Sequence, residues 1–118
     1  MTDSPGAVVI RPTGDLDATA GPGFRRQVEQ AVSSGAPLIV VDMILVDFLD
    51  SAGLAALFGA RRLLPDGHRL ALANVPRRMQ RVLQLTAVGT LMEVHEQGQP
   101  WPWPEVVLDS AAEGTPSG

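Results

Sequence analysis

Hydrophobic positions along the chain fall into short continuous runs separated by stretches with helical spacing. The runs are of strand length, and most are rich in β-branched or aliphatic residues. They predict four strands, over Ala7–Arg11, Pro37–Asp42, Arg69–Ala73 and Leu91–Val94. The run at Pro37–Asp42 has no polar residue before its final aspartate, which is typical of a strand covered on both faces.

Helical spacing appears between these runs. After Gly21-Pro22-Gly23, apolar residues recur every three to four positions as far as Ser33-Ser34-Gly35, and Pro22 suits the first turn of a helix. The same spacing resumes at Ser51 and stops at Pro65-Asp66-Gly67, and a third helix is expected over Arg77–Leu85. The residues expected to face the core from these helices are Phe24, Val28, Ala31, Val32, Leu54, Leu57, Phe58, Leu64, Met79, Val82 and Leu83.

Strands and helices therefore alternate, and this order predicts an α/β fold. Crossover helices between successive strands favour a mostly parallel or mixed sheet of about four to five strands, with the helices packed on it. The segment from Met43 to Asp50 is expected to be a connection, with Val46 and Phe48 buried.

The chain has 118 residues, and its composition changes after Gln97. Residues 1–97 are expected to form the domain, and residues 98–118 a Pro/Trp-rich extension. Pro100-Trp101-Pro102-Trp103-Pro104 favours an extended, polyproline-like path. A short terminal helix is expected from Pro104 through Leu108, and the end from Glu113 is expected to be disordered.

Charge and composition exclude several function classes. The net charge is −4 and the pI is near 4.9, which argues against a nucleic-acid-binding protein. The chain has no cysteine, and all nine basic residues are arginine, so thiolate and lysine chemistry are excluded. No cofactor and no metal site are expected. Without a signal peptide or an apolar membrane-length run, the expected location is the cytoplasm, with no membrane insertion.

The informative stretch is Asp50-Ser51-Ala52-Gly53-Leu54, which places a hydroxyl and a carboxylate at the start of a predicted helix. Free N–H groups and the positive end of the helix dipole favour a phosphoryl group there. Serine at a helix start is also commonly an N-cap, and Asp50 is an alternative cap. Gly53 would let a partner's backbone or a nucleotide approach closely. The sequence leaves the capping and phosphate-accepting roles of Ser51 open.

This stretch resembles the Asp-Ser-(Ser/Thr/Ala)-Gly-Leu signature of the STAS-domain anti-sigma factor antagonists. The upstream Thr13-Gly14-Asp15-Leu16-Asp17 is similar to the Gly-(Asp/Glu)-(Leu/Ile)-Asp turn of the same family. The order and spacing of the two motifs also fit, and the resemblance covers Ala7 to Glu96.

The resemblance implies a STAS fold and a non-enzymatic partner-switching function. An anti-sigma factor, which is a serine kinase of the histidine-kinase-like ATPase fold, would phosphorylate Ser51. The unphosphorylated protein would bind this kinase and release the sigma factor, and a metal-dependent serine phosphatase would reset the cycle. The implied partner-binding residues are Asp15, Asp17, Asp50, Ser51, Ala52, Gly53 and Leu54.

Two departures from the family pattern affect this interpretation. Ala52 stands where many members have a second hydroxyl, which leaves Ser51 as the sole acceptor in the motif. Gly21-Pro22-Gly23 is expected to delay the first helix and to alter the loop near Asp17.

Two alternative functions make different demands on the sequence. A STAS subunit of a membrane transporter complex, for lipid or anion transport, would have the same fold and use Ser51 only as a cap or contact. A flavodoxin-like phosphatase would need a nucleophile with an adjacent base or a glycine-rich phosphate loop, and the sequence has neither. Arg77, Arg78 and Arg81 are expected to form a solvated helix face or to pair with acidic side chains.

Overall fold

The protein, described here from a computed structural model, is an α/β sandwich built on a parallel sheet. The structure describes residues 6–86, 88–98 and 107–108. The sheet has the strand order β6-β5-β3-β1-β7, and every neighbouring pair is parallel. The mostly parallel sheet expected from the alternation of elements is thus confirmed. Its strands are β1 (Ala7–Ile10), β3 (Leu38–Asp42), β5 (Arg69–Val75), β6 (Glu93–Glu96) and β7 (Val107–Leu108).

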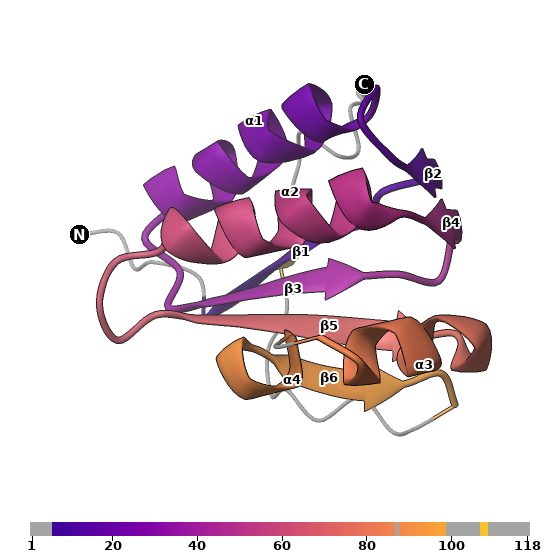
Figure 1. Ribbon diagram of the computed structural model, residues 1–118. Coiled ribbons are helices and arrows are strands. Elements are labelled where there is room, and N and C mark those ends of the chain that lie inside the picture. Colours follow the sequence, from indigo (N-terminus) through magenta and orange to yellow (C-terminus); the bar gives the residue numbers. More distant parts are fainter. Residues whose placement is uncertain (1–5, 87, 99–106, 109–118) are drawn as a thin grey trace.

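Three helices of two or more turns connect the strands, together with one short helix. Helix α1 spans Gly21–Ser33 and α2 spans Ser51–Arg62, and the two contact each other over the sheet (Figure 1). Helix α3 covers Arg77–Gln84, and the short α4 (Val88–Leu91) precedes β6. The last of the four expected strands therefore begins two residues later than predicted, because α4 occupies the apolar residues before it.

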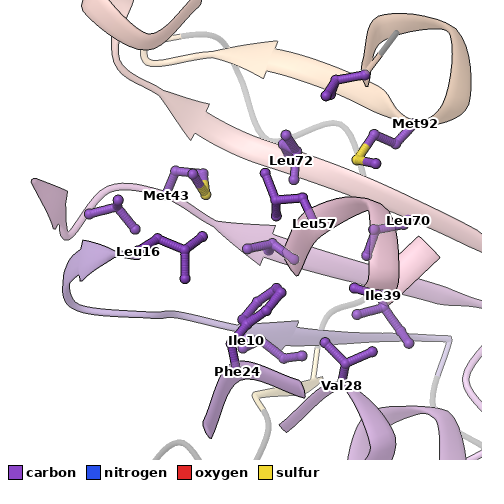
Figure 2. Packing of buried hydrophobic residues seen from close by; sticks show 14 of the residues in the cluster. Ile10, Leu16, Phe24, Val28, Ile39, Met43, Leu57, Leu70, Leu72 and Met92 are labelled. Carbon is purple, nitrogen blue, oxygen red and sulfur yellow. The ribbon is translucent and has the colours of Figure 1, made fainter. Parts of the chain in front are cut away.

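The main core lies between the helices and one face of the sheet. Alternate residues of β1, β3 and β5 meet Phe24 and Val28 of α1 and Leu57 of α2 in one cluster (Figure 2). Alternate side chains of a strand point to opposite faces, so the remaining residues of the same strands form a second cluster. That second cluster consists of Ala7, Val9, Leu38, Val40, Ala71 and Ala73. The Leu38–Asp42 strand is buried throughout, as its apolar run indicated.

A second, two-stranded sheet was not foreseen from the sequence. Strand β2 (Gly14–Leu16) pairs in parallel with β4 (Val46–Leu49), which lies in the segment expected to be a connection. The two strands lie together beside the end of the main sheet, where α2 begins (Figure 1). This pairing joins segments about 30 residues apart in sequence, and strand pairs of that kind depend on tertiary context rather than on local pattern.

The expected terminal helix is wrong at Val107 and Leu108, which form β7. The two residues pair in parallel with Val8 and Val9 of β1, a strand that would otherwise have one unpaired edge. Backbone groups along a free sheet edge favour pairing with another strand. The remaining expectations for the extension, at Pro100–Pro104 and from Glu113 onward, lie outside the described residues.

A buried polar network joins the carboxyl ends of the three central strands. Asp42 is 3% exposed; its Oδ2 accepts a hydrogen bond from Arg11 Nε at 2.9 Å, and its Oδ1 accepts one from Asn74 Nδ2 at 2.9 Å. The backbone N–H of Ile44 also donates to Oδ1 at 3.0 Å. Asn74 has a φ of 54°, a left-handed conformation that asparagine tolerates better than most residues. The network therefore sets the direction in which the chain leaves β3 toward β4.

Replacing Asp42 with alanine is expected to lower the free energy of unfolding by about 2–3 kcal/mol. The loss follows because Arg11, Asn74 and the N–H of Ile44 lose their acceptor, while the exposure of the Arg11 side chain limits the cost. Urea denaturation of the purified variant measures the loss. Asp42→Asn, which keeps one carbonyl acceptor, should lose less; equal stability of the alanine variant and the parent would contradict the role assigned to the network.

Candidate functional site

The site is built where β2 and β4 end side by side. Leu16 pairs with Leu49 in the parallel register, so Asp17 and Asp50 are the next residues on adjacent strands. Adjacent strands lie about 4.8 Å apart. The pairing thus brings together the two sequence motifs, although more than 30 residues separate them in the chain.

Asp50 is the N-cap of α2. Its backbone is extended, with φ −112° and ψ −170°, and its Oδ1 accepts a hydrogen bond from the N–H of Gly53 at 2.9 Å. Its own carbonyl accepts the first intrahelical bond, from the N–H of Leu54 at 2.9 Å. The choice that the sequence left open is therefore decided in favour of Asp50 as the cap.

Ser51 is the first helical residue and is exposed. Its hydroxyl has no hydrogen-bond partner among the residues that the structure describes. The side chain is not needed to cap the helix, and it faces solvent beside free N–H groups of the first turn. This is a suitable position for a hydroxyl that reacts with a partner.

Asp17 serves the turn that follows β2. Its Oδ1 accepts hydrogen bonds from the backbone N–H of Thr19 at 3.0 Å and of Ala20 at 3.1 Å, and its carbonyl accepts one from the N–H of Gly21 at 3.0 Å. Helix α1 then begins at Gly21 with Pro22 in its first turn. The Gly-Pro-Gly segment thus starts the helix directly after the Asp17 turn, and Asp17 remains partly exposed beside Ser51's helix.

Gly53 is buried, and the reason is internal to the protein. A Cβ atom at this position would overlap the carbonyl oxygen of Leu16 and would lie 2.7 Å from Cδ1 of Leu49. The close approach that glycine permits is made by α2 to β2 and β4. We therefore revise the interpretation that Gly53 lets a partner or nucleotide approach.

The other predicted site residues divide by exposure. Asp15 is exposed, Ala52 is half-buried, and Leu54 packs against the core cluster while remaining partly exposed. Asp47, on β4, is exposed as well. Four carboxylates, those of Asp15, Asp17, Asp47 and Asp50, therefore lie on the paired strands β2 and β4 or directly after them, in the segments that position Ser51. Within the described ranges, no group of three or more histidine or carboxylate side chains is placed to hold a metal ion.

The backbone contacts of Arg78 and the exposure of Phe48 differ from what the sequence predicted. The Nη2 of Arg78 donates hydrogen bonds to the carbonyls of Asp47 at 3.0 Å and Val46 at 3.4 Å, rather than pairing with a carboxylate. Phe48, expected to be buried, is 54% exposed, and Leu49 is buried in its place. No local signal in the sequence marks either one, because both depend on how β4 pairs with β2.

Replacing Gly53 with alanine is expected to lower the free energy of unfolding by about 2–4 kcal/mol, because the added methyl group displaces the backbone of Leu16. Gly59 is a matched control in the same helix, because a Cβ atom added there would meet no other atom within 4 Å outside the helix's own backbone. Gly59→Ala should be neutral or stabilising by up to about 1 kcal/mol through helix propensity. Denaturant unfolding of both variants measures the difference, and similar effects of the two would contradict the contact.

Exchanging the cap and the serine for alanine separates their roles. Asp50→Ala is expected to lower the free energy of unfolding by about 1 kcal/mol, because the N–H of Gly53 loses its acceptor. Ser51→Ala should change it by less than about 0.5 kcal/mol, as at an ordinary surface position. Thermal and urea unfolding test the pair; a larger loss at Ser51 than at Asp50 would reverse the assignment.

No helix in the described part of the chain has the length and apolar character needed to cross a membrane.

The sequence is 25% identical over 93 residues to an anti-sigma F factor antagonist from Paenibacillus polymyxa, covering 77% of this chain and 80% of that one. The structure resembles the Bacillus cell fate determinant SpoIIAA in its phosphorylated form, with a TM-score of 0.58 and 28% identity over 80% of this chain and 86% of that one.

A sulfate transporter family protein from Wolinella succinogenes shares the fold, with a TM-score of 0.68 and 16% identity over 79% of each chain. At that identity the likeness concerns the fold alone. The family model of the STAS domain matches residues 1–98. The β2–β4 pairing, the capped helix start and this match agree with the motif resemblance, and the chain belongs to the STAS domain family.

Proposed function

We propose that this protein is an anti-sigma factor antagonist whose partner binding is switched by phosphorylation of Ser51. The observation that carries the proposal is the exposed hydroxyl of Ser51, which has no hydrogen-bond partner among the described residues and lies beside an aspartate that already caps the helix. The related antagonist from Paenibacillus and the phosphorylated SpoIIAA support it. The transporter-subunit alternative has only a fold-level likeness behind it.

In the proposed cycle, the unphosphorylated protein binds an anti-sigma factor that is a serine kinase of the histidine-kinase-like ATPase fold. Ser51 and the neighbouring Asp15, Asp17 and Asp50 contact the kinase, and binding frees the sigma factor. Transfer of the γ-phosphoryl group from ATP to Ser51 Oγ releases ADP and ends the complex. A metal-dependent serine phosphatase then hydrolyses the phosphoserine.

Electrostatics explain how one modification can end binding. A phosphoserine carries nearly two negative charges at neutral pH, and Ser51 directly follows Asp50, which stands beside Asp17 at the ends of the paired strands. A partner surface fitted to a neutral hydroxyl would then meet concentrated negative charge. A loss of about 2.7 kcal/mol lowers affinity a hundredfold, so release requires no refolding of α2.

The test is phosphoryl transfer measured by intact mass. The purified protein is incubated with ATP, Mg²⁺ and each small histidine-kinase-like ATPase of the source organism. We expect one of these kinases to add a single phosphoryl group to the parent and none to Ser51→Ala. Thr19→Val, which removes an exposed hydroxyl from the neighbouring turn, is the matched control and should be modified like the parent.

Two results would contradict the proposal. One is the same mass gain in Ser51→Ala as in the parent. The other is the absence of any mass gain across the full set of kinases. Stable binding to a transporter ATPase, in place of a kinase, would favour the transporter-subunit function.

A further inference from the structure

Strand β4 contains a one-residue irregularity at Asp47, four positions before Ser51. Gly14 pairs with Val46, but the next residue of β2, Asp15, pairs with Phe48. The pairing advances one residue on β2 and two on β4, so Asp47 is an extra residue with no partner. This is the pattern of a β-bulge, which re-aims the side chains that follow it.

The bulge decides which side chain enters the core. Regular alternation from the buried Val46 would turn Phe48 inward and Leu49 outward. The extra residue reverses this, so that Leu49 is 7% exposed beneath Gly53 and Phe48 is 54% exposed. The aromatic ring is thus directed to the surface on the strand that leads into Ser51.

A side chain from another element, helix α3, forms hydrogen bonds with the irregular part of β4. Arg78, on α3, donates from Nη2 to the carbonyls of Val46, the last residue before the shift, and of Asp47, the extra residue. Bulged strands leave backbone groups without ladder partners, and charged donors to such groups form strong hydrogen bonds. The exposed position of Phe48 is therefore a fixed feature of the fold.

Other exposed hydrophobic side chains lie close to Phe48 in the sequence. Six large hydrophobic side chains are exposed among the described residues, and three of them, Ile44, Leu45 and Phe48, lie within five consecutive positions. Single exposed hydrophobic residues are ordinary, whereas a group of them commonly marks a binding surface. Asp15, the register partner of Phe48, and Asp47 give this apolar patch an acidic border.

We propose that the patch of Ile44, Leu45 and Phe48 is the apolar half of the surface that binds the anti-sigma factor kinase. This inference rests on the proposed function and assigns the kinase as the occupant. Phe48 lies three residues before Ser51 on the same strand-to-helix segment, so a protein whose active site reaches Ser51 also covers the patch. The kinase surface that it fits is an apolar depression rimmed by basic side chains, matching Phe48 and the bordering aspartates.

The proposal gives different roles to the apolar patch and to Ser51 with its neighbouring aspartates. Buried aromatic side chains contribute much of the affinity at protein interfaces, whereas charged groups at the rim act mainly on specificity and association rate. Phe48 would hold the kinase, and the charge on Ser51 would decide whether it stays. Phosphorylation of Ser51 does not alter the patch, so the patch can contact the kinase again each time Ser51 is dephosphorylated.

The test compares Phe48→Ala with Leu85→Ala, a truncation of a side chain that is 82% exposed at the end of α3. Affinity for the kinase that phosphorylates the parent is measured by calorimetry with ADP, and phosphorylation by intact mass. We expect Phe48→Ala to weaken binding about 30-fold or more, the effect of losing an interface hot spot. Leu85→Ala should bind within about twofold, and both variants should unfold at the parent's midpoint.

The possible results distinguish the patch assignment from the proposed switch at Ser51. A Phe48→Ala variant that binds like the parent, while Ser51 is still phosphorylated, overturns the patch assignment and leaves the proposed function intact. A kinase that binds through Phe48 without modifying Ser51 supports the patch and contradicts the switch. Absence of any kinase binding overturns both. A parent dimer that Phe48→Ala dissociates, seen by sedimentation, would replace the kinase by a second copy as occupant.

Discussion

The close contact between α2 and β2 is the constraint on which the site depends. Gly53 lies so near the carbonyl of Leu16 that no larger residue fits without moving the backbone. This contact holds the start of α2 against the β2–β4 pair. Asp17, Asp50 and Ser51 consequently stand at fixed places relative to one another, although they come from two distant segments. A small residue here serves packing within the protein, and its effect on function is indirect.

The arrangement of hydrogen bonds at the helix start separates structural from chemical roles. Asp50 supplies the cap by accepting from Gly53, and Asp17 stabilises its own turn by accepting from Thr19 and Ala20. Ser51, with no hydrogen-bond partner in the described part of the chain, can be modified without breaking a hydrogen bond that the fold needs. The proposed phosphorylation of Ser51 would change the charge of this surface and leave the scaffold unchanged, which suits a switch based on electrostatic repulsion.

Two polar groups on other elements govern the segment between β3 and α2. Asp42 ties the end of β3 to Arg11 and Asn74 and receives the N–H of Ile44, while Arg78 binds the carbonyls beside the bulge. Together they define the path of the chain from the main sheet to Ser51. Their positions explain how this short segment, which contains β4, presents both hydrophobic and acidic side chains at its surface.

The sequence by itself determined the alternating elements, the parallel sheet and the two motifs, because apolar periodicity, glycine and proline act within a few residues. It also placed an aspartate and a serine at a helix start, although it did not decide which of them caps. Only the tertiary structure decided that β2 pairs with β4, that Val107 and Leu108 form a strand, and that Phe48 rather than Leu49 faces outward. These features depend on hydrogen bonds and packing between distant segments. The shift of one residue in a strand register exchanges its two faces without any trace in the local pattern.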